Sequence, residues 1–416
     1  MTTTIFTPIH KPELDKLWEL YESLRAQIWK VDEWVILCNG GAKDWIIDFI
    51  DRDKDPWIKV YHTDTTGNIG ALKGECCDLA LGDILIEVDY DDHLTPDAVE
   101  LIYMAFRDNM VQFVYSNSVE YLPDGSSQVY GAQYGWQTKP HGDQTQMIAF
   151  PPKAQYFRRI EWAPNHVRAF RRSAYEAIGG YDKNIQVGDD HELVCRFYVG
   201  FGEHGFRHIN ECLYLYRVHD GNTCNGRNRN AEIQKQVDAN YCRYAEKMYL
   251  RWADDNGLDC YDLGGRFNSP PGYQSVDLLD ADVIADLTKA WPMPDNSVGV
   301  LRAYHIIEHL PDSIHFFNEA YRVLAPGGFL LIEVPSSNGE GAWSDPTHIN
   351  FMNKLSFEYF TNRDFAKFIQ PQYTGRFQKA RVVEYWWKHP EIPIISAQLI
   401  AIKGWYNERW AGEKQI

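Results

Sequence analysis

The stretch Gly82-Asp83-Ile84-Leu85-Ile86-Glu87-Val88-Asp89-Tyr90-Asp91-Asp92 decides how this chain folds. Its first seven residues carry the recurring apolar and β-branched side chains of a buried strand. Three carboxylates, on Asp89, Asp91 and Asp92, then follow at the carboxyl end of that strand. Like charges this close repel one another unless a cation lies between them, and oxygen ligands favour Mg²⁺ or Mn²⁺. The pattern predicts a divalent metal site; the alternative is an acidic loop that only solvates a strand end.

Strand and helix patterns alternate before this stretch. Short apolar strands are expected at 3–7, 34–38 and 58–62, and amphipathic helices at 13–28 and 71–81. Alternation of this kind indicates an α/β fold with a parallel sheet, whose ligand site lies at the carboxyl ends of the strands. The acidic cluster stands where this rule places a ligand.

Four segments, taken in order, resemble the family 2 glycosyltransferases, which have the GT-A nucleotide-sugar-binding fold. They are Phe6 to His10, Gly67 to Lys73, Glu87 to Pro96, and a last block made of 179–182, 188–193 and 216–219. The resemblance covers residues 1–225. It implies a metal-dependent enzyme that moves a sugar, with inversion, from a nucleotide-sugar to a glycan or another hydroxyl acceptor.

The same resemblance assigns roles to individual residues. The implied metal ligands for Mn²⁺ or Mg²⁺ are Asp89, Asp91 and His219. The implied donor-binding residues are Pro8, His10, Asn39, Asn68, Lys73 and Asp89. Asp190 matches the catalytic base, with Asp189 as a supporting or acceptor-contacting residue, and neighbouring acids are expected to raise the pKa of the base. Asn39 stands where the family usually has an acidic residue, so UDP is the default donor nucleotide rather than a fixed one.

Each role has a plain structural alternative. His219 is otherwise a surface histidine on the turn at 220–222, and Asp190 is otherwise an N-cap for the helix that follows it. Lys73 is equally well explained as a solvated lysine on a helix. These alternatives stay open on the sequence alone.

A second α/β pattern begins after an amphipathic helical linker over 226–256. Residues 258–360 resemble the class I S-adenosylmethionine-dependent methyltransferases, which have a Rossmann-like fold. The resemblance rests on Glu308-His309-Leu310, on Arg322-Val323-Leu324-Ala325-Pro326-Gly327-Gly328, and on Asp345-Pro346-Thr347-His348. The chain is therefore expected to hold a GT-A domain at 1–225 and a methyltransferase-like domain at 257–416.

The resemblance implies a site for S-adenosylmethionine. Its residues would be Gly264, Gly265, Asp277, Asp286 and His305. However, the first loop reads Leu263-Gly264-Gly265-Arg266-Phe267-Asn268, with bulky residues where the family has glycines that let the backbone approach the cofactor. Two interpretations remain open: an unusual working methyl-donor site, or a domain kept for stability, assembly or acceptor binding.

Composition limits the remaining choices. The net charge of −17 over 416 residues does not indicate general affinity for nucleic acid or for an anionic membrane. One local exception, Lys153 to Arg172, has six basic residues and one acidic residue, and either faces phosphates or is a solvated surface. It leaves open a viral-type glycosyltransferase acting on hydroxylated DNA bases. A third alternative is a non-catalytic scaffold that binds nucleotides or glycans.

The eight cysteines show no metal-binding spacing and are expected to be reduced thiols. No signal peptide or bilayer-spanning apolar run is visible, so a cytoplasmic protein is expected.

Overall fold

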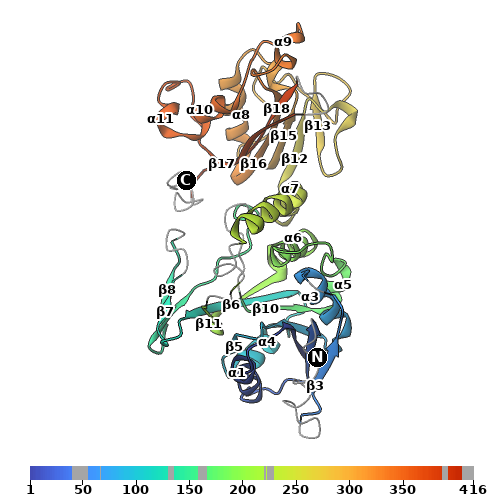
Figure 1. The fold of residues 1–416 in the computed structure, drawn as a ribbon. Coiled ribbons are helices and arrows are strands. Elements are labelled where there is room, and N and C mark those ends of the chain that lie inside the picture. Colours follow the sequence, from blue (N-terminus) through green and yellow to red (C-terminus); the bar gives the residue numbers. More distant parts are fainter. Residues whose placement is uncertain are drawn as a thin grey trace. The chain divides into compact units, whose positions relative to one another are not determined.

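The computed structural model describes residues 1–39, 55–65, 67–129, 135–157, 166–219, 222, 229–386 and 392–404. The chain divides into two compact units, Met1–Ala245 and Glu246–Ile416, each with its own sheet (Figure 1). The division falls inside the long helix α7 (Asn230–Asp255), in the stretch where the sequence predicted a helical linker. Among the helices of the described ranges, none is long and apolar enough to cross a membrane.

The first unit is built on a mixed sheet. Its main strands, in spatial order, are β3 (Ile58–His62), β2 (Glu33–Asn39), β1 (Thr3–His10), β4 (Ile84–Glu87), β10 (Arg168–Arg171), β6 (Phe113–Tyr121), β11 (Phe206–Arg217) and β5 (His93–Leu94). The shorter strands β7 (Ser127–Gln128), β8 (Thr138–His141) and β9 (Gln144–Met147) extend from β6. Strands β3, β2, β1 and β4 are parallel, as predicted, but β10 runs antiparallel to both β4 and β6.

Helices cover both faces of this sheet (Figure 1). Helices α1 (Leu14–Arg25) and α4 (Ala98–Ala105) pack on one face, against residues such as Ile5, Ile36 and Ile86. Helices α3 (Ile69–Leu79), α5 (Arg172–Ala177) and α6 (Asp189–Phe201) lie on the other, where an aromatic cluster includes Phe113 and Phe170. The two faces follow from the alternation of side chains along each strand.

Strand β1 is longer than the sequence predicted. A strand ending at residue 7 was expected because proline usually terminates a ladder, yet Pro8 pairs with Leu37 and the strand continues to His10. The register between β1 and β4 stops at Phe6, so at Pro8 no residue of β4 is paired and the missing N–H leaves no ladder bond unmade on that side. This extension carries His10 to the carboxyl edge of the sheet.

The second unit has one sheet of seven strands. In order they are β14 (Val283–Ile284), β13 (Gln274–Asp277), β12 (Asp259–Leu263), β15 (Val298–Tyr304), β16 (Leu324–Pro335), β18 (Pro393–Ala401) and β17 (Phe377–Trp386). The first five are parallel and the last two antiparallel. The helices are α8 (Ser313–Val323), α9 (Gly341–Ser344), α10 (Glu358–Thr361) and α11 (Arg363–Ala366). The parallel strands have the order expected of a Rossmann-like sheet, with β12, the first strand of the unit, between β13 and β15.

Strand β16 begins inside the segment Arg322 to Gly328 on which the methyltransferase resemblance rests. Its first residue is Leu324, and it contains Gly327 and Gly328. The pairing with β15 passes from Val298–Leu324 directly to Val300–Phe329, so the intervening residues form a bulge.

Candidate active site

Three parallel strands of the first unit end at the same edge of the sheet. Strands β1, β2 and β4 end at His10, Asn39 and Glu87, and Asp89 to Asp92 follow β4 directly. The ring nitrogen Nδ1 of His10 lies 2.6 Å from Oδ1 of the buried Asn39. The Asn39 oxygen that was expected to accept a bond from a nucleobase therefore already has a partner, while half-buried Pro8 and exposed His10 line the same edge.

Asp91 and His219 meet at this edge. Nε2 of His219 lies 2.7 Å from Oδ2 of Asp91, and both side chains are about 15% exposed. The backbone N–H of His219 donates to the side chain of Asn222 at 2.6 Å. The structure thus brings together two of the three predicted metal ligands, which are 128 residues apart in the sequence.

Strand β11 holds this pair through Asp92. The Asp92 carboxylate is buried and accepts bonds from the backbone N–H of Arg217 at 2.7 Å and from the Tyr214 hydroxyl at 2.8 Å. The guanidinium of Arg217 also donates to the backbone oxygen of Asp91 at 3.0 Å. Asp92 therefore has a structural role, because it fastens the acidic loop to the strand that leads to His219.

The acidic loop carries unbalanced negative charge. Burial raises the pKa of Asp89 to about 6, and the charges of Glu87 and Asp91 contribute although Lys73 opposes them. Burial and the charges of Asp91 and Asp89 also raise the pKa of Asp92 well above its ordinary value. A divalent cation at this edge would relieve that repulsion, and carboxylate with imidazole is a donor set that Mn²⁺ accepts.

Five charged side chains form a network beneath the loop. Lys73 Nζ lies 2.9 Å from both Glu87 Oε1 and Asp189 Oδ2. The Arg168 guanidinium donates two hydrogen bonds to Glu87, at 2.9 and 3.3 Å, and its third nitrogen lies 3.3 Å from Asp190 Oδ2. We call Lys73, Glu87, Arg168, Asp189 and Asp190 the ion network. The Tyr181 hydroxyl adds a bond to Glu87 at 2.7 Å.

The network separates two neighbouring acids on α6. Asp189 is buried, and burial raises its pKa although Lys73 lies opposite. The side chain of Asp190 is 38% exposed, and its pKa is lowered because Arg168 and Lys73 outweigh the effect of burial. The expected rise in the pKa of the base is therefore wrong for Asp190, since a guanidinium rather than another acid is its near neighbour. It is nevertheless Asp190 that faces the accessible side.

Lys73 and Asn68 have structural contacts. Lys73 is neither solvated nor turned toward a diphosphate, since its ammonium is buried between two carboxylates. Asn68 caps α3 through a bond from the Ala71 N–H at 2.9 Å and donates to the Lys183 carbonyl at 2.7 Å. Neither contact supports the donor-binding role that resemblance implied. A side chain on Gly70 would lie 2.8 Å from two backbone oxygens, which explains the glycine of this segment.

The basic stretch Lys153 to Arg172 does not form a phosphate-facing surface in its described part. Arg168 is buried in the ion network, while Arg171 and Arg172 donate to backbone carbonyls, including those of Val111 and Gly82 at 2.7 and 2.8 Å. Lys153 pairs with Glu203 at 3.6 Å. The remaining predicted members, Arg158 and Arg159, lie outside the described residues.

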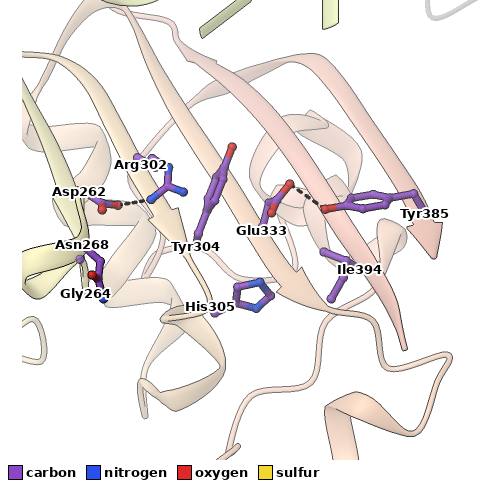
Figure 2. A pocket seen from close by; sticks show the side chains of 10 residues that line it. Asp262, Gly264, Asn268, Arg302, Tyr304, His305, Glu333, Tyr385 and Ile394 are labelled. Atoms are coloured by element: carbon purple, nitrogen blue, oxygen red, sulfur yellow. Dashed lines mark hydrogen bonds and ion pairs between the residues drawn. The ribbon is translucent and has the colours of Figure 1, made fainter. Parts of the chain in front are cut away.

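The second unit has a cavity of about 410 Å³ at the carboxyl ends of its strands (Figure 2). Figure 2 shows the Asp262 carboxylate facing Arg302 at 2.8 Å, and Glu333 facing the Tyr385 hydroxyl at 3.0 Å. The Arg302 guanidinium also lies over the Tyr304 ring, 3.8 Å from its centroid. The cavity wall is thus polar and internally paired.

The predicted cofactor residues are only partly gathered there. Gly264, Gly265 and His305 line the cavity, whereas Asp277 and Asp286 are not among its lining residues. Asp277 lies 3.5 Å from Arg266, a loop residue with a left-handed φ of 44°, and Asp286 bonds the hydroxyl and N–H of Thr288. Three of the five residues expected to bind S-adenosylmethionine therefore line the cavity, and the two aspartates make other contacts.

Sequence reasoning missed the central part of the ion network. Glu87 was assigned to the strand and Arg168 to a surface cluster, because local patterns do not show that β10 pairs with β4. The available signal was Glu87 itself, a carboxylate in an otherwise apolar strand, since a buried charge requires a partner.

Comparison with known families agrees with both units. Residues 4–179 match the family model described as glycosyl transferase family 2, and residues 271–332 match the one described as a methyltransferase domain. The chain therefore carries an N-terminal family 2 glycosyltransferase domain and a C-terminal methyltransferase domain, as the sequence predicted.

Relatives are similar to one unit or the other. Chondroitin synthase of Pasteurella multocida is 27% identical over 198 residues, which are 46% of this chain and 18% of that protein. A probable S-adenosylmethionine-dependent methyltransferase of Mycolicibacterium smegmatis is 36% identical over 101 residues, 23% of this chain and 37% of that protein. The chain thus spans less than half the length of either relative. The structure of S. aureus TarS 1-349 in complex with UDP-GlcNAc is 12% identical, with a TM-score of 0.45, and the match covers 61% of this chain and 71% of that one.

Proposed function

We propose that the N-terminal domain transfers a sugar, with inversion, from a nucleotide-sugar to a hydroxyl group of a glycan acceptor, with UDP as the default nucleotide. The observation that carries the proposal is the meeting of Asp91 and His219 at the same sheet edge as an ionised and accessible Asp190. The family match and the similarity to proteins named chondroitin synthase and hyaluronan synthase support it.

Asp190 is the proposed base. Its carboxylate takes the proton of the acceptor hydroxyl while the acceptor oxygen bonds to the anomeric carbon and the bond to the diphosphate breaks. Arg168 keeps this carboxylate ionised and fixes its direction, and the Arg168 guanidinium is itself held by the two hydrogen bonds that it donates to Glu87. A positioned base of this kind contributes about 10²- to 10⁴-fold to the rate.

Asp91 and His219 are the proposed protein ligands of Mn²⁺ or Mg²⁺, with Asp89 beside them. A bound divalent ion would supply positive charge for the diphosphate leaving group. Because Lys73 is enclosed by two carboxylates, it supplies no positive charge to the donor in this proposal. The diphosphate leaving group therefore depends all the more on the charge of a bound metal ion.

The test uses the full chain with a panel of nucleotide-sugars, with and without Mn²⁺, and measures release of the nucleoside diphosphate in the presence of glycan acceptors. Asp190→Asn should lower kcat by about 10²- to 10⁴-fold, and Asp91→Asn should remove the response to Mn²⁺. Asp78→Asn is the matched control, because Asp78 is an exposed acid paired with Lys183 on the same unit. Full activity of Asp190→Asn would contradict the assignment of the base.

We propose separately that the C-terminal domain binds S-adenosylmethionine in its cavity. The position of the cavity at the strand ends and the methyltransferase match support binding. Calorimetric titration of the full chain with S-adenosylmethionine tests this proposal. Absence of binding would favour a domain kept for stability, assembly or acceptor binding.

The two other functions considered have less support. The described basic residues of the stretch Lys153 to Arg172 are paired within the chain. The basic cluster that suggested a DNA acceptor therefore no longer supports one. A non-catalytic scaffold has no need for an accessible ionised acid beside a repulsive acidic loop. It would be favoured if no nucleotide-sugar were turned over.

A further inference from the structure

Glu308, His309 and His348 form a compact cluster in the second unit. One donor atom from each residue lies within 4.8 Å of the other two. Glu308 and His309 belong to a 3₁₀ turn, η4 (Ile307–His309), which follows strand β15, and His348 follows helix α9. The backbone N–H of Ile349 donates to the carbonyl oxygen of Glu308 at 2.8 Å, so the main chain holds the two segments together.

The hydrogen bonds of the two imidazoles fix their tautomers. Nδ1 of His348 lies 2.9 Å from the carbonyl oxygen of Ala342, which only accepts, so this nitrogen carries the proton. Nδ1 of His309 lies 3.0 Å from the Thr347 hydroxyl, whose own proton goes to Asp345 at 2.6 Å, and 3.3 Å from the Thr347 carbonyl. Nδ1 of His309 therefore also donates. Both rings are left with a lone pair on Nε2.

This pattern is typical of metal ligands. A histidine that binds a metal through one nitrogen almost always donates its other N–H to a carbonyl or carboxylate, which orients the ring. The two rings here are 4.9 Å apart between centroids and inclined at 66°, so they are not stacked on each other.

Glu308 supplies an independent observation. Its side chain is 2% exposed, and its Oε2 finds no hydrogen-bond partner within the described part of the chain. Its other oxygen lies 3.5 Å from His305 Nδ1. A buried carboxylate oxygen without a partner is costly, since desolvation is not compensated, and a metal ion is one of the few groups that compensate it.

We propose that Glu308, His309 and His348 bind a divalent transition-metal ion of the Zn²⁺ type. Two imidazoles and one carboxylate are a known ligand set for zinc, and three protein ligands leave one position for water or a substrate oxygen. The Asp345 carboxylate, 3.8 Å from His348 Nε2, lies at the side of the site.

The site adjoins the cavity of the second unit. His305 lines that cavity, and its Nδ1 lies 3.5 Å from Oε1 of Glu308. A proposed ligand of the ion is therefore in contact with a residue of the cavity wall. Binding would also fasten the segment after α9 to the end of β15. The ion is thus placed to order the cavity edge and to contact an oxygen of a ligand bound there.

Metal titration of the full chain tests the proposal. The chelator-treated protein is titrated with Zn²⁺ against a chromogenic chelator, and with Co²⁺ as a spectroscopic probe. We expect one tight equivalent that is weakened at least about 100-fold in His348→Gln and in Glu308→Gln. His315→Gln is the matched control, because His315 is a half-buried histidine of the same unit that lies outside the cluster and whose Nε2 is 2.9 Å from the Lys289 carbonyl oxygen.

The glycosyltransferase site is the rival explanation for bound metal. A tight equivalent that persists in His348→Gln and disappears in His219→Gln would overturn the proposal, as would the absence of any tight equivalent. Should the cluster variants fail to fold, X-ray absorption on the zinc-loaded wild type decides. Two imidazole ligands are expected at the proposed site, whereas the Asp91 and His219 pair supplies only one.

Discussion

Replacing Lys73 with methionine separates a structural role from a donor-binding one. Methionine has similar length and removes the ammonium, which leaves Asp189 without its cation while Glu87 keeps Arg168 and Tyr181. If the ion network is structural, the variant loses stability in the first unit. If Lys73 instead served the donor diphosphate, it would lose donor affinity with little change in stability.

The contact distances set the size of the effect. Each of the two 2.9 Å ion pairs has a Coulomb energy of about 6 kcal/mol at an effective dielectric constant of about 20, before desolvation is subtracted. Removing one partner of a buried pair typically costs about 3–5 kcal/mol, because the remaining charge is uncompensated. We expect Lys73→Met to lower the free energy of unfolding of the first unit by that amount near neutral pH.

The loss should depend on pH. Burial already raises the pKa of Asp189, so between the ordinary aspartate value of about 4 and its folded value the folded protein binds more protons than the unfolded one. In that window stability falls as pH rises. Removing Lys73 raises the pKa of Asp189 further, so the difference between wild type and variant should grow as the pH rises above the ordinary aspartate value of about 4.

Urea unfolding with pulsed thiol labelling measures this unit separately. Cys76 and Cys77 are buried on α3, next to Lys73, and become reactive when the first unit unfolds. Lys183→Met is the matched control, because Lys183 pairs with Asp78 at a similar distance, 2.8 Å, but at the surface, where a pair is worth about 0–1 kcal/mol. A loss in Lys73→Met no larger than in the control would refute the reasoning.

Further predictions concern both units. His219→Asn should raise the Mn²⁺ concentration needed for half-maximal activity by about 10- to 100-fold, and an unchanged metal titration would contradict the predicted ligand. Because Arg168 and Lys73 hold the pKa of Asp190 below its ordinary value despite burial, the base stays ionised, and kcat should show no loss assignable to it down to about pH 5. Gly265→Ala should destabilise the second unit by about 1–3 kcal/mol in urea unfolding, since its Cβ would lie 2.3 Å from Asp262 Oδ2 and Ser269 Oγ; wild-type stability would show that the loop relaxes freely.

Local patterns predicted the parts of the fold that depend on local order. The strand at Ile58–His62 has the predicted bounds, because its β-forming residues lie between polar segments. The acidic loop was placed at a strand end by the same means. The rule that parallel strands share a carboxyl edge placed the acidic loop there, and the structure shows that β1 and β2 end at the same edge, at His10 and Asn39.

Local sequence patterns could not predict the contacts between segments that are far apart in the chain. Arg168 and Glu87 are 81 residues apart, and their pairing depends on β10 inserting antiparallel beside β4. On the sequence Lys73 was equally well explained as a solvated lysine on a helix. The two carboxylates that it contacts, those of Glu87 and Asp189, belong to distant segments of the chain. The His219 prediction came from resemblance, and the structure adds the 2.7 Å contact with Asp91 that composition alone does not give.

The neighbours Asp189 and Asp190 show why residue type does not settle role. Both are aspartates in the first turn of α6; the sequence left Asp190 as either a base or an N-cap, with Asp189 as a supporting or acceptor-contacting residue. Successive positions on a helix point about 100° apart, so one side chain turns inward to the Lys73 ammonium and the other outward past Arg168. Burial then raises the pKa of the inner acid, while the guanidinium lowers that of the outer one. A proton acceptor must be both ionised and reachable, and of the two only Asp190 meets both conditions.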